Sequence, residues 1–286
     1  MARRKPTVQE LRKLGLAHDK AIEAEGDDVI RELRRFFKNY IRDAEGLIAT
    51  RAGGTSKLDL AVAAQIAADL EALTSDAGLP LVLDRYSQSL DASLLKAISY
   101  FEPMGFSIDV QAIDTDTIER LARIQIDDLI REVDRALVRP LQDAVINSTV
   151  GVDTPEAAVA QVKNIIDSEG VLTKDGNDFT DFQVETLVRD SQVRFYRDSK
   201  ARQAENLGLQ VVVYEGPFDN KTRPACQALL TSGTHGPENM YYIEEFTTSL
   251  HEDLVEPPLI AGGGYNCRHV VNYLTLETAI EAGFNP

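Results

Sequence analysis

The chain has 286 residues, of which 43% are hydrophobic and 27% charged, so it can bury a core and is neither fibrous nor disordered in composition. Its formal net charge of -16 argues against a general nucleic-acid-binding role, because affinity for phosphate comes from clustered lysine and arginine. Tryptophan is absent, so packing must rest on aliphatic side chains, which favours helices. No apolar run of about 20 residues is present, and we expect no transmembrane helix and no membrane partner.

The N-terminus carries an excess of positive charge. Up to Lys13 it holds one acidic residue, Glu10, and five basic ones: Arg3, Arg4, Lys5, Arg12 and Lys13. Such an arm either contacts DNA or an acidic protein surface, or it is a solvated chain end, and the pattern fits both. No apolar segment of the kind found in secretory signals follows it, so we expect the chain to stay in the cytoplasm in which it is made.

The first half of the chain, residues 7 to about 150, predicts helices almost throughout. One apolar face is formed by residues at three- and four-residue steps: Leu33, Phe36, Phe37, Tyr40 and Ile41. Residues 53–56, Gly-Gly-Thr-Ser, interrupt this pattern, and Ser56 is placed to cap a second helix that ends near Gly78. A third helix is predicted from Pro80 to Tyr100.

A fourth helix is predicted after residue 115. Asp116 and Glu119 have the spacing of a capping box, and apolar residues recur at helical spacing up to Leu137. Pro140 should kink or end this helix, because proline lacks an amide hydrogen and clashes with the preceding turn. We expect a helical bundle with an aliphatic core, and no titratable residue in this half is marked out as catalytic.

The organisation changes near residue 150, where strand-like segments begin to alternate with helices. The elements predicted in the second half are a helix at 181–206, strands at 209–214 and 269–274, and a short helix at 276–282. The sequence therefore predicts a mainly α N-terminal region, residues 1–150, joined to a small α+β C-terminal module, residues 151–286.

The densest group of functional-looking side chains lies between residues 214 and 269. It contains both cysteines, three of the four histidines and three charged residues: Asp219, Arg223, Cys226, His235, His251, Cys267, Arg268 and His269. Each cysteine flanks a predicted strand, so the two thiols would meet if those strands pair.

Three interpretations of this group stay open. Zinc binds thiolate and imidazole ligands, and the segment supplies three of them: Cys226, Cys267 and His269. A fourth ligand would come from His235, His251 or Asp219. The alternatives are a thiol pair or disulfide without metal, and two small buried thiols in the core. Because no CxxC unit is present, the spacing does not require a cofactor, and zinc is the one that the residue types fit.

An enzyme is a further alternative, as a metal- or thiol-dependent hydrolase. A nucleophile would be Cys226 or Cys267 with a histidine as its base. The sequence places no third orienting group and no oxyanion donor beside them, and it indicates no small-molecule substrate. We therefore expect no enzymatic activity.

Two short motifs frame the polar segment, and a helix with Arg189, Arg194 and Arg197 precedes them. The motif residues are Asp219, Thr222, Arg223, Pro224 and Cys226 after the first strand, and Asn266, Cys267, Arg268 and His269 before the last. In order, spacing and residue type, the segment from about Thr186 to His269 resembles the C-terminal domain of the Mu F-like minor head (head morphogenesis) proteins of tailed phages. Where that family often has a Pro-His element, this chain has residues 260–264, Ile-Ala-Gly-Gly-Gly, so a histidine ligand there has no counterpart.

The resemblance implies a minor capsid component of a phage or prophage, made in the bacterial host cytoplasm and carried in the virion head. Such a protein is expected to bind the portal protein and other head proteins, and to assist head assembly or DNA delivery. DNA contact through the basic N-terminal arm is a separate expectation from the residues. A head–tail connector or adaptor, which would form a ring of fixed stoichiometry, is the other structural alternative.

Overall fold

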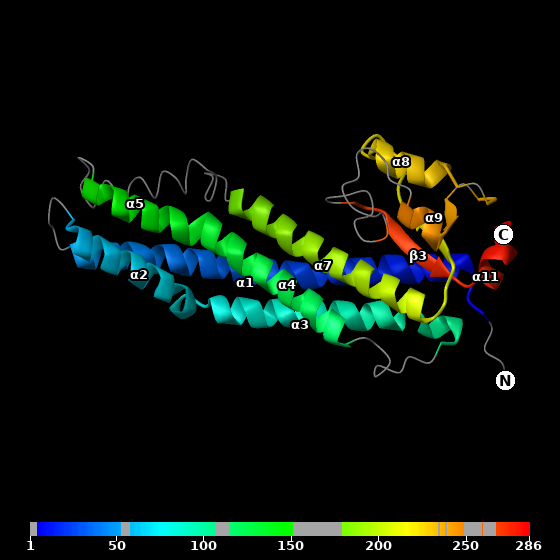
Figure 1. The fold of residues 1–286 in the computed structure, drawn as a ribbon, viewed down its shortest axis with the longest axis horizontal. Coiled ribbons are helices and arrows are strands. Elements are labelled where there is room, and N and C mark those ends of the chain that lie inside the picture. Colours follow the sequence, from blue (N-terminus) through cyan, green and yellow to red (C-terminus); the bar gives the residue numbers. More distant parts are fainter. Residues whose placement is uncertain are drawn as a thin grey trace. The chain divides into compact units, whose positions relative to one another are not determined.

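The computed structural model describes residues 5–52, 58–106, 115–150, 179–233, 235–237, 239–248, 259 and 267–286. Helices dominate these residues, and their strands form one small antiparallel sheet near the C-terminus (Figure 1), which confirms the predicted fold class. Packing divides the chain into two units. The sheet unit comprises Met1–Glu25, Ser89–Ala122 and Arg189–Pro286, and the helical unit comprises Gly26–Gln88 and Arg123–Val188. Each unit therefore draws on both sides of residue 150.

The helical unit is built from α-helices and one π-helical segment. They are the later part of α1 (Val8–Ala52), α2 (Leu60–Asp76), the first part of α3 (Leu79–Ser99), the part of α4 (Thr115–Val133) from Arg123 on, η3 (Asp134–Val138) and α5 (Arg139–Val150). Of the predicted apolar face on α1, four side chains are buried: Leu33, Phe36, Phe37 and Tyr40. The Tyr40 hydroxyl donates to the Leu70 carbonyl on α2 at 2.9 Å, and Gln142 on α5 donates to the Ala67 carbonyl at 2.9 Å. Among the described helices, none combines the length and apolar character needed to cross a membrane.

Two helix starts differ from their predicted positions. Helix α2 begins at Leu60, and its cap is Asp59, whose carboxylate accepts from the Ala61 amide at 3.0 Å. The predicted cap, Ser56, lies outside the described residues. The capping box at Asp116 is wrong, because α4 already begins at Thr115 and Asp116 lies in its first turn. A carboxylate in that turn still stabilises the helix, because its negative charge lies near the positive end of the helix dipole.

The helix does not end at Pro140, although the sequence allowed either an end or a kink at this residue. Helix α4 continues through η3 into α5, and the Arg139 amide bonds to the carbonyl of Asp134, five residues back. The wider turn adds one residue to the hydrogen-bond spacing immediately before the proline, which has no amide hydrogen to contribute. The predicted kink therefore takes the form of a π-helical turn.

The sheet unit combines a three-stranded sheet with helices. Its described elements are the first part of α1, the end of α3, η1 (Glu102–Met104), α7 (Phe179–Asn206) from Arg189 on, β1 (Val211–Glu215), α8 (Pro224–Thr231), β2 (Met240–Tyr242), α9 (Ile243–Thr248), β3 (Val270–Leu274) and α11 (Leu276–Glu281). The strand order is β2-β1-β3, with both pairs antiparallel. Val213 pairs with Met240 on one side and with Asn272 on the other. The two predicted strands are present and pair with each other, whereas β2 is an additional strand.

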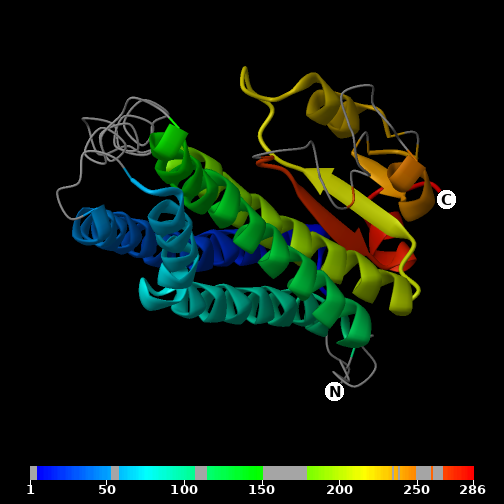
Figure 2. The same ribbon diagram turned by 60° about the vertical axis from the view of Figure 1, so that its left-hand side comes forward.

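Helix α7 holds β3 in place with polar side chains. Figure 2 shows α7 along one face of the sheet, with α8 and α9 on the other. The Lys200 ammonium donates to the Val271 carbonyl at 2.8 Å, and the Arg197 guanidinium donates to the His269 carbonyl at 2.6 Å. Both side chains are buried. These bonds fix the start of β3, where two of the candidate site residues lie.

Candidate metal centre at one end of the sheet

The antiparallel pairing of β1 and β3 brings the two cysteines together. Glu215, the last residue of β1, pairs with Val270, the first residue of β3. The chain after β1 turns into α8, whose first turn contains Cys226, while Cys267 and His269 come directly before β3. Both sequence motifs therefore meet at the same end of the sheet.

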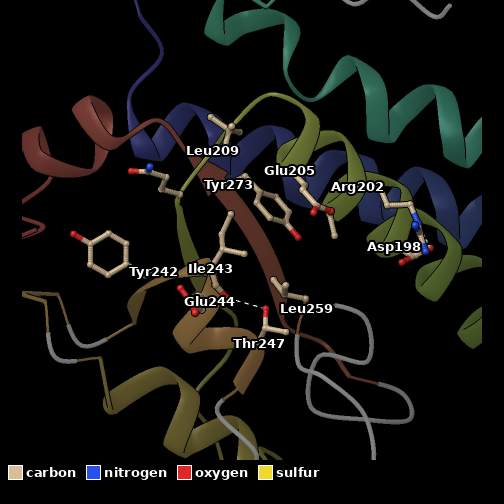
Figure 3. A pocket seen from close by; sticks show the side chains of 13 residues that line it. Asp198, Arg202, Glu205, Leu209, Tyr242, Ile243, Glu244, Thr247, Leu259 and Tyr273 are labelled. Atoms are coloured by element: carbon tan, nitrogen blue, oxygen red, sulfur yellow. Dashed lines mark hydrogen bonds and ion pairs between the residues drawn. The ribbon is translucent and has the colours of Figure 1, made fainter. Parts of the chain in front are cut away.

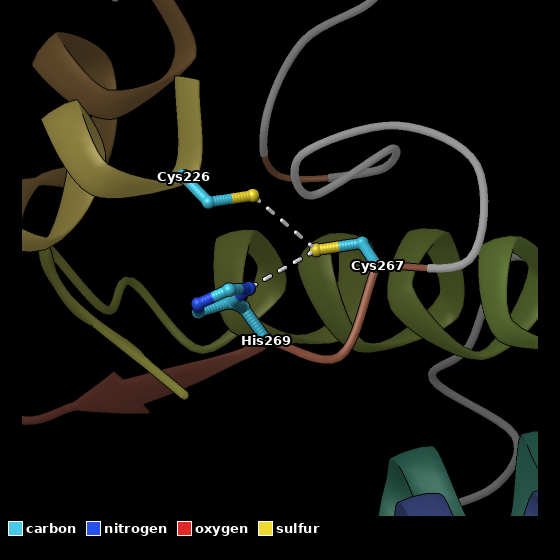
Figure 4. Close-up of side chains that lie close together, drawn as sticks. All are labelled: Cys226, Cys267 and His269. Carbon is cyan, nitrogen blue, oxygen red and sulfur yellow. Dashed lines mark hydrogen bonds between the residues drawn. The ribbon is translucent and has the colours of Figure 1, made fainter. Parts of the chain in front are cut away.

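Three potential ligand atoms cluster at this end. The Sγ atoms of Cys226 and Cys267 are 3.9 Å apart, and Cys267 Sγ is 3.6 Å from His269 Nδ1 (Figure 4). All three atoms lie within 4.8 Å of one another, and this group could hold a metal ion. Cys226 and His269 are each only 2% exposed. Two sulfurs and one imidazole nitrogen form a donor set that suits zinc.

The pKa values of the two thiols are shifted in opposite directions. Hydrogen bonding from Cys226 is the main cause that lowers the pKa of Cys267, and the positive charge of Arg197 acts in the same direction. The same hydrogen bond raises the pKa of Cys226. Of the two thiols, Cys267 is therefore the one that ionises more readily, and a bound cation would favour loss of the second proton.

Tyr214 forms one wall of the cluster. Its hydroxyl donates to Cys226 Sγ at 3.5 Å and lies 3.4 Å from Cys267 Sγ. Its ring stacks on the imidazole of His269, with centroids 5.2 Å apart and an angle of 11° between the planes. Burial, followed by the neighbouring Cys267 charge, raises the pKa of Tyr214, so the phenol stays protonated and can donate its proton to Cys226 Sγ.

The backbone of the β1–α8 turn orients the imidazole of His269. Its Nε2 lies 2.9 Å from the Pro217 carbonyl, and because a carbonyl only accepts, Nε2 carries the proton. In the neutral imidazole, Nδ1 then carries the lone pair that a metal ligand requires. A Cβ atom on Gly216 would lie 2.2 Å from His269 Cδ2, so a glycine is needed where this turn passes the ring.

Asp219 lies beside the cluster, but its carboxylate bonds to Arg268 and to the backbone of its own turn. Its carboxylate receives two bonds from the Arg268 guanidinium, at 2.9 and 2.7 Å, and one from the Lys221 amide at 2.9 Å. The hydrogen bonds from Arg268 are the main cause that holds the pKa of Asp219 well below its usual range. Thr222 closes the turn by donating to the Pro217 carbonyl at 2.8 Å. Asp219 is therefore engaged in bracing the turn and is not one of the three clustered ligands.

His235, the other described candidate for a fourth ligand, also lies outside the group of three. Its Nδ1 is 3.0 Å from the Asn285 carbonyl, and its Nε2 is 2.9 Å from a Glu245 carboxylate oxygen. That carboxylate raises the pKa of His235. His251 and Asn266 lie outside the described residues.

The remaining family-motif residues shape the start of α8. Arg223 has an extended backbone at the N-cap position, and Pro224 follows at the first helical position, where a missing amide hydrogen is harmless. Sequence reasoning did not assign site roles to Tyr214, Gly216 and Pro217. The available signal was the Gly-Pro pair directly after a strand that ends in Tyr-Glu, but the contacts with His269 come from a distant part of the chain.

The basic N-terminal arm is only partly available for contact with other molecules. Lys5 forms an ion pair with Glu277, and the Arg12 guanidinium lies 3.6 Å from a Glu215 carboxylate oxygen. Lys13 is exposed, whereas Arg3 and Arg4 lie outside the described residues.

No protein-family model, curated protein or solved structure matches the chain. The geometry of the site and the resemblance of its two motifs therefore carry the functional inference.

Proposed function

We propose that the protein is a minor capsid component of a phage or prophage, located in the virion head, that binds the portal protein or neighbouring head proteins and assists head assembly or DNA delivery. One observation supports this most strongly. The residues through which the sequence resembles the Mu F-like minor head proteins converge on one site, although the two motifs are far apart in the chain. Asp219 and Arg268 join the motifs by an ion pair, and Cys226 meets Cys267 and His269.

Within this proposal the cluster has a structural role, and zinc is the ion that its donors fit. Cys226 Sγ, Cys267 Sγ and His269 Nδ1 would hold the ion, and the described residues supply three ligands. Bound there, zinc would tie the start of α8 to the start of β3. Burial of Cys226 and His269 agrees with a closed structural site, because a catalytic zinc needs a position open to substrate.

The turn between β1 and α8, residues 216–223, is the braced turn, and it offers a contact surface for a head protein. Phe218 lies between Pro217 and Asp219, which the cluster and the ion pair hold, and it is 62% exposed. An aromatic side chain presented by a fixed turn loses little conformational freedom on binding, which suits an interface anchor. Phe218→Ser should weaken portal binding while the melting temperature stays the same.

The direct test is co-expression with the portal protein encoded by the same phage or prophage. The proposal expects the two proteins to co-purify at a fixed ratio, and expects Arg268→Lys to reduce the amount of bound protein. A chain that folds normally but never co-purifies with portal or head proteins would contradict the proposal.

A thiol-dependent hydrolase is the second candidate, because Cys267 Sγ lies 3.6 Å from His269 Nδ1 and the pKa of Cys267 is lowered. In a catalytic triad the second imidazole nitrogen usually bonds to a carboxylate or amide side chain, whereas here it bonds to the Pro217 carbonyl. Replacing both cysteines by serine separates the two candidates. A hydrolase predicts intact head binding and a lost activity, whereas a structural site predicts a lower melting temperature and weaker head binding.

A further inference from the structure

A second feature of the sheet unit lies apart from the thiol–imidazole cluster. A pocket of about 750 Å³ opens between the C-terminal part of α7, the segment leading into β1, and the start of α9 (Figure 3). None of its lining residues belongs to the cluster or to the braced turn. Its volume falls within the range of sites that enclose a small ligand or an inserted side chain.

The base of the pocket is apolar and aromatic. Leu209, Leu259 and Tyr273 are buried in it, and Tyr242 and Ile243 are half-buried beside them. The Tyr273 hydroxyl is buried and has no hydrogen-bond partner among the described residues. Figure 3 shows this hydroxyl pointing toward the side of the pocket where Glu205 and Leu259 lie. A buried hydroxyl without a partner is unfavourable, and a donor on a ligand would satisfy it.

The rim of the pocket is negatively charged. Asp198 and Arg202 neutralise one another through an ion pair of 2.9 Å. The other two ionisable rim residues, Glu205 and Glu244, are exposed, and neither carboxylate has a hydrogen bond or ion pair with a described residue. The pocket therefore combines aromatic side chains with a hydroxyl and two carboxylates that have no polar partner within the described part of the chain.

We infer that this pocket receives an arginine side chain from a partner protein. The aliphatic stem of arginine would contact Leu209 and Ile243, and its planar guanidinium would lie on the side of the pocket where the Tyr273 hydroxyl and Glu205 are (Figure 3). The guanidinium carries several N–H donors, which suits the Tyr273 oxygen and the rim carboxylates better than the single ammonium of lysine.

A partner protein is favoured over a free small cation because Leu209, Ile243 and Leu259 give the pocket an apolar part, and because the whole chain is strongly acidic, with a net charge of -16. An acidic protein docks on a basic counterpart, and aliphatic residues beside the arginine would add apolar contact. The inference deepens the proposed function, on which its choice of partner rests: the arginine would belong to a portal or head protein.

The test is a binding titration of the full-length protein at low ionic strength with the peptide acetyl-Leu-Arg-Leu-amide. The matched control peptide has citrulline in place of arginine, which keeps the shape and removes the charge. We expect the arginine peptide to bind at least about tenfold more tightly than the citrulline peptide. Agmatine, a free guanidinium compound, should bind more weakly than the arginine peptide, because it lacks the flanking leucines.

Substitutions inside and outside the pocket test whether the arginine peptide binds there. Glu205→Gln combined with Glu244→Gln should weaken binding of the arginine peptide about tenfold, since two carboxylates are neutralised. Glu102→Gln combined with Glu281→Gln removes the same charge from exposed positions outside the pocket and should leave binding unchanged. Tyr273→Phe should keep the melting temperature, because the lost hydroxyl has no partner, and should weaken binding.

Equal affinity for the arginine and citrulline peptides, or unchanged binding in the pocket variants, would overturn the inference. Agmatine binding as tightly as the peptide would overturn the choice of a protein partner. Failure of this inference is distinguishable from failure of the proposed function. A wild-type protein that co-purifies with the portal but ignores the peptide rejects the pocket alone, whereas peptide binding without any head association rejects the proposed function.

Discussion

Asp219 and Arg268, 49 positions apart in the sequence, form a two-pronged ion pair with N–O distances of 2.9 and 2.7 Å. This pair connects the turn after β1 with the segment before β3. Because the planar guanidinium meets both carboxylate oxygens, the pair fixes an orientation as well as a distance. The thiol–imidazole cluster lies directly beside it, since Arg268 stands between Cys267 and His269 in the sequence.

The first prediction concerns this ion pair. Arg268→Lys keeps the positive charge but cannot make two parallel bonds, so the pKa of the Asp219 carboxyl should rise toward its ordinary value. Because Asp219 is exposed, we expect little change in overall stability. A carboxyl-detected NMR titration of the wild type and the variant measures this. An Asp219 that titrates identically in both proteins would show that Arg268 does not hold the turn.

The second prediction concerns metal. Purified protein should contain about one zinc ion per chain, and a chelator should lower its melting temperature by roughly 5 °C or more. Cys226→Ser combined with Cys267→Ser should lower the melting temperature in the absence of chelator and abolish the chelator effect. His235→Ala is the matched control, because His235 lies outside the group of three and should leave the zinc content unchanged. Full zinc content in the double cysteine variant would contradict a metal at this cluster.

The third prediction concerns the buried ammonium of Lys200. It donates to the Val271 carbonyl at 2.8 Å and lies 3.6 Å from the centre of the Tyr100 ring. Burial is the main cause that lowers the pKa of Lys200 to about 7, and the charge of Asp19 acts in the opposite direction. Between that value and the ordinary lysine pKa of 10.5, the unfolded chain binds more protons than the folded chain. The free energy of unfolding should therefore rise with pH across this window.

Urea unfolding at several pH values between 7 and 9.5 measures the effect of Lys200. We expect an increase on the order of 2 kcal/mol in the wild type across this range of pH. Lys200→Met should flatten this dependence, because the titrating group is gone. The absolute stability of the variant is not the readout, since the Val271 carbonyl loses a donor. A variant with the same pH slope as the wild type would exclude Lys200 as its source.

The fourth prediction concerns the N-terminal arm. Deleting the arm would also remove Leu11, which is 1% exposed and belongs to the sheet-unit core, so loss of DNA binding could then reflect unfolding. Replacing Arg3, Arg4 and Lys13 by glutamine avoids this. If the arm contacts DNA, retention on DNA at low salt should fall in the variant, and its salt dependence should become shallower. Unchanged retention would end the proposal of DNA contact through these residues.

The parts of the fold that could be predicted from the sequence are those with local signals. The β-branched runs around Val212 and Val271 predicted β1 and β3, and their pairing explains why the thiols meet. The strand β2 escaped prediction because three residues, Met240–Tyr242, are too few to show alternation. Helix starts were placed a few residues away because several polar residues near each start can act as a cap.

The details of the site depend on pairs that no local pattern shows. His235 and Asp219 are suitable zinc ligands by residue type, but Glu245 and Arg268 engage them from other segments. The buried polar side chains of α7, such as Lys200, follow no amphipathic pattern, so their contacts with β3 could not be anticipated. Residue types therefore identified the three side chains that cluster, whereas long-range partners determined which other candidates lie outside the cluster.

The central claim, a minor head protein, is tested most directly by quantitative mass spectrometry of purified virions from the phage or prophage that encodes the chain. The account predicts a few copies per particle that remain with the portal when the heads are disrupted. Particles that form and package DNA but contain none of this protein would contradict it.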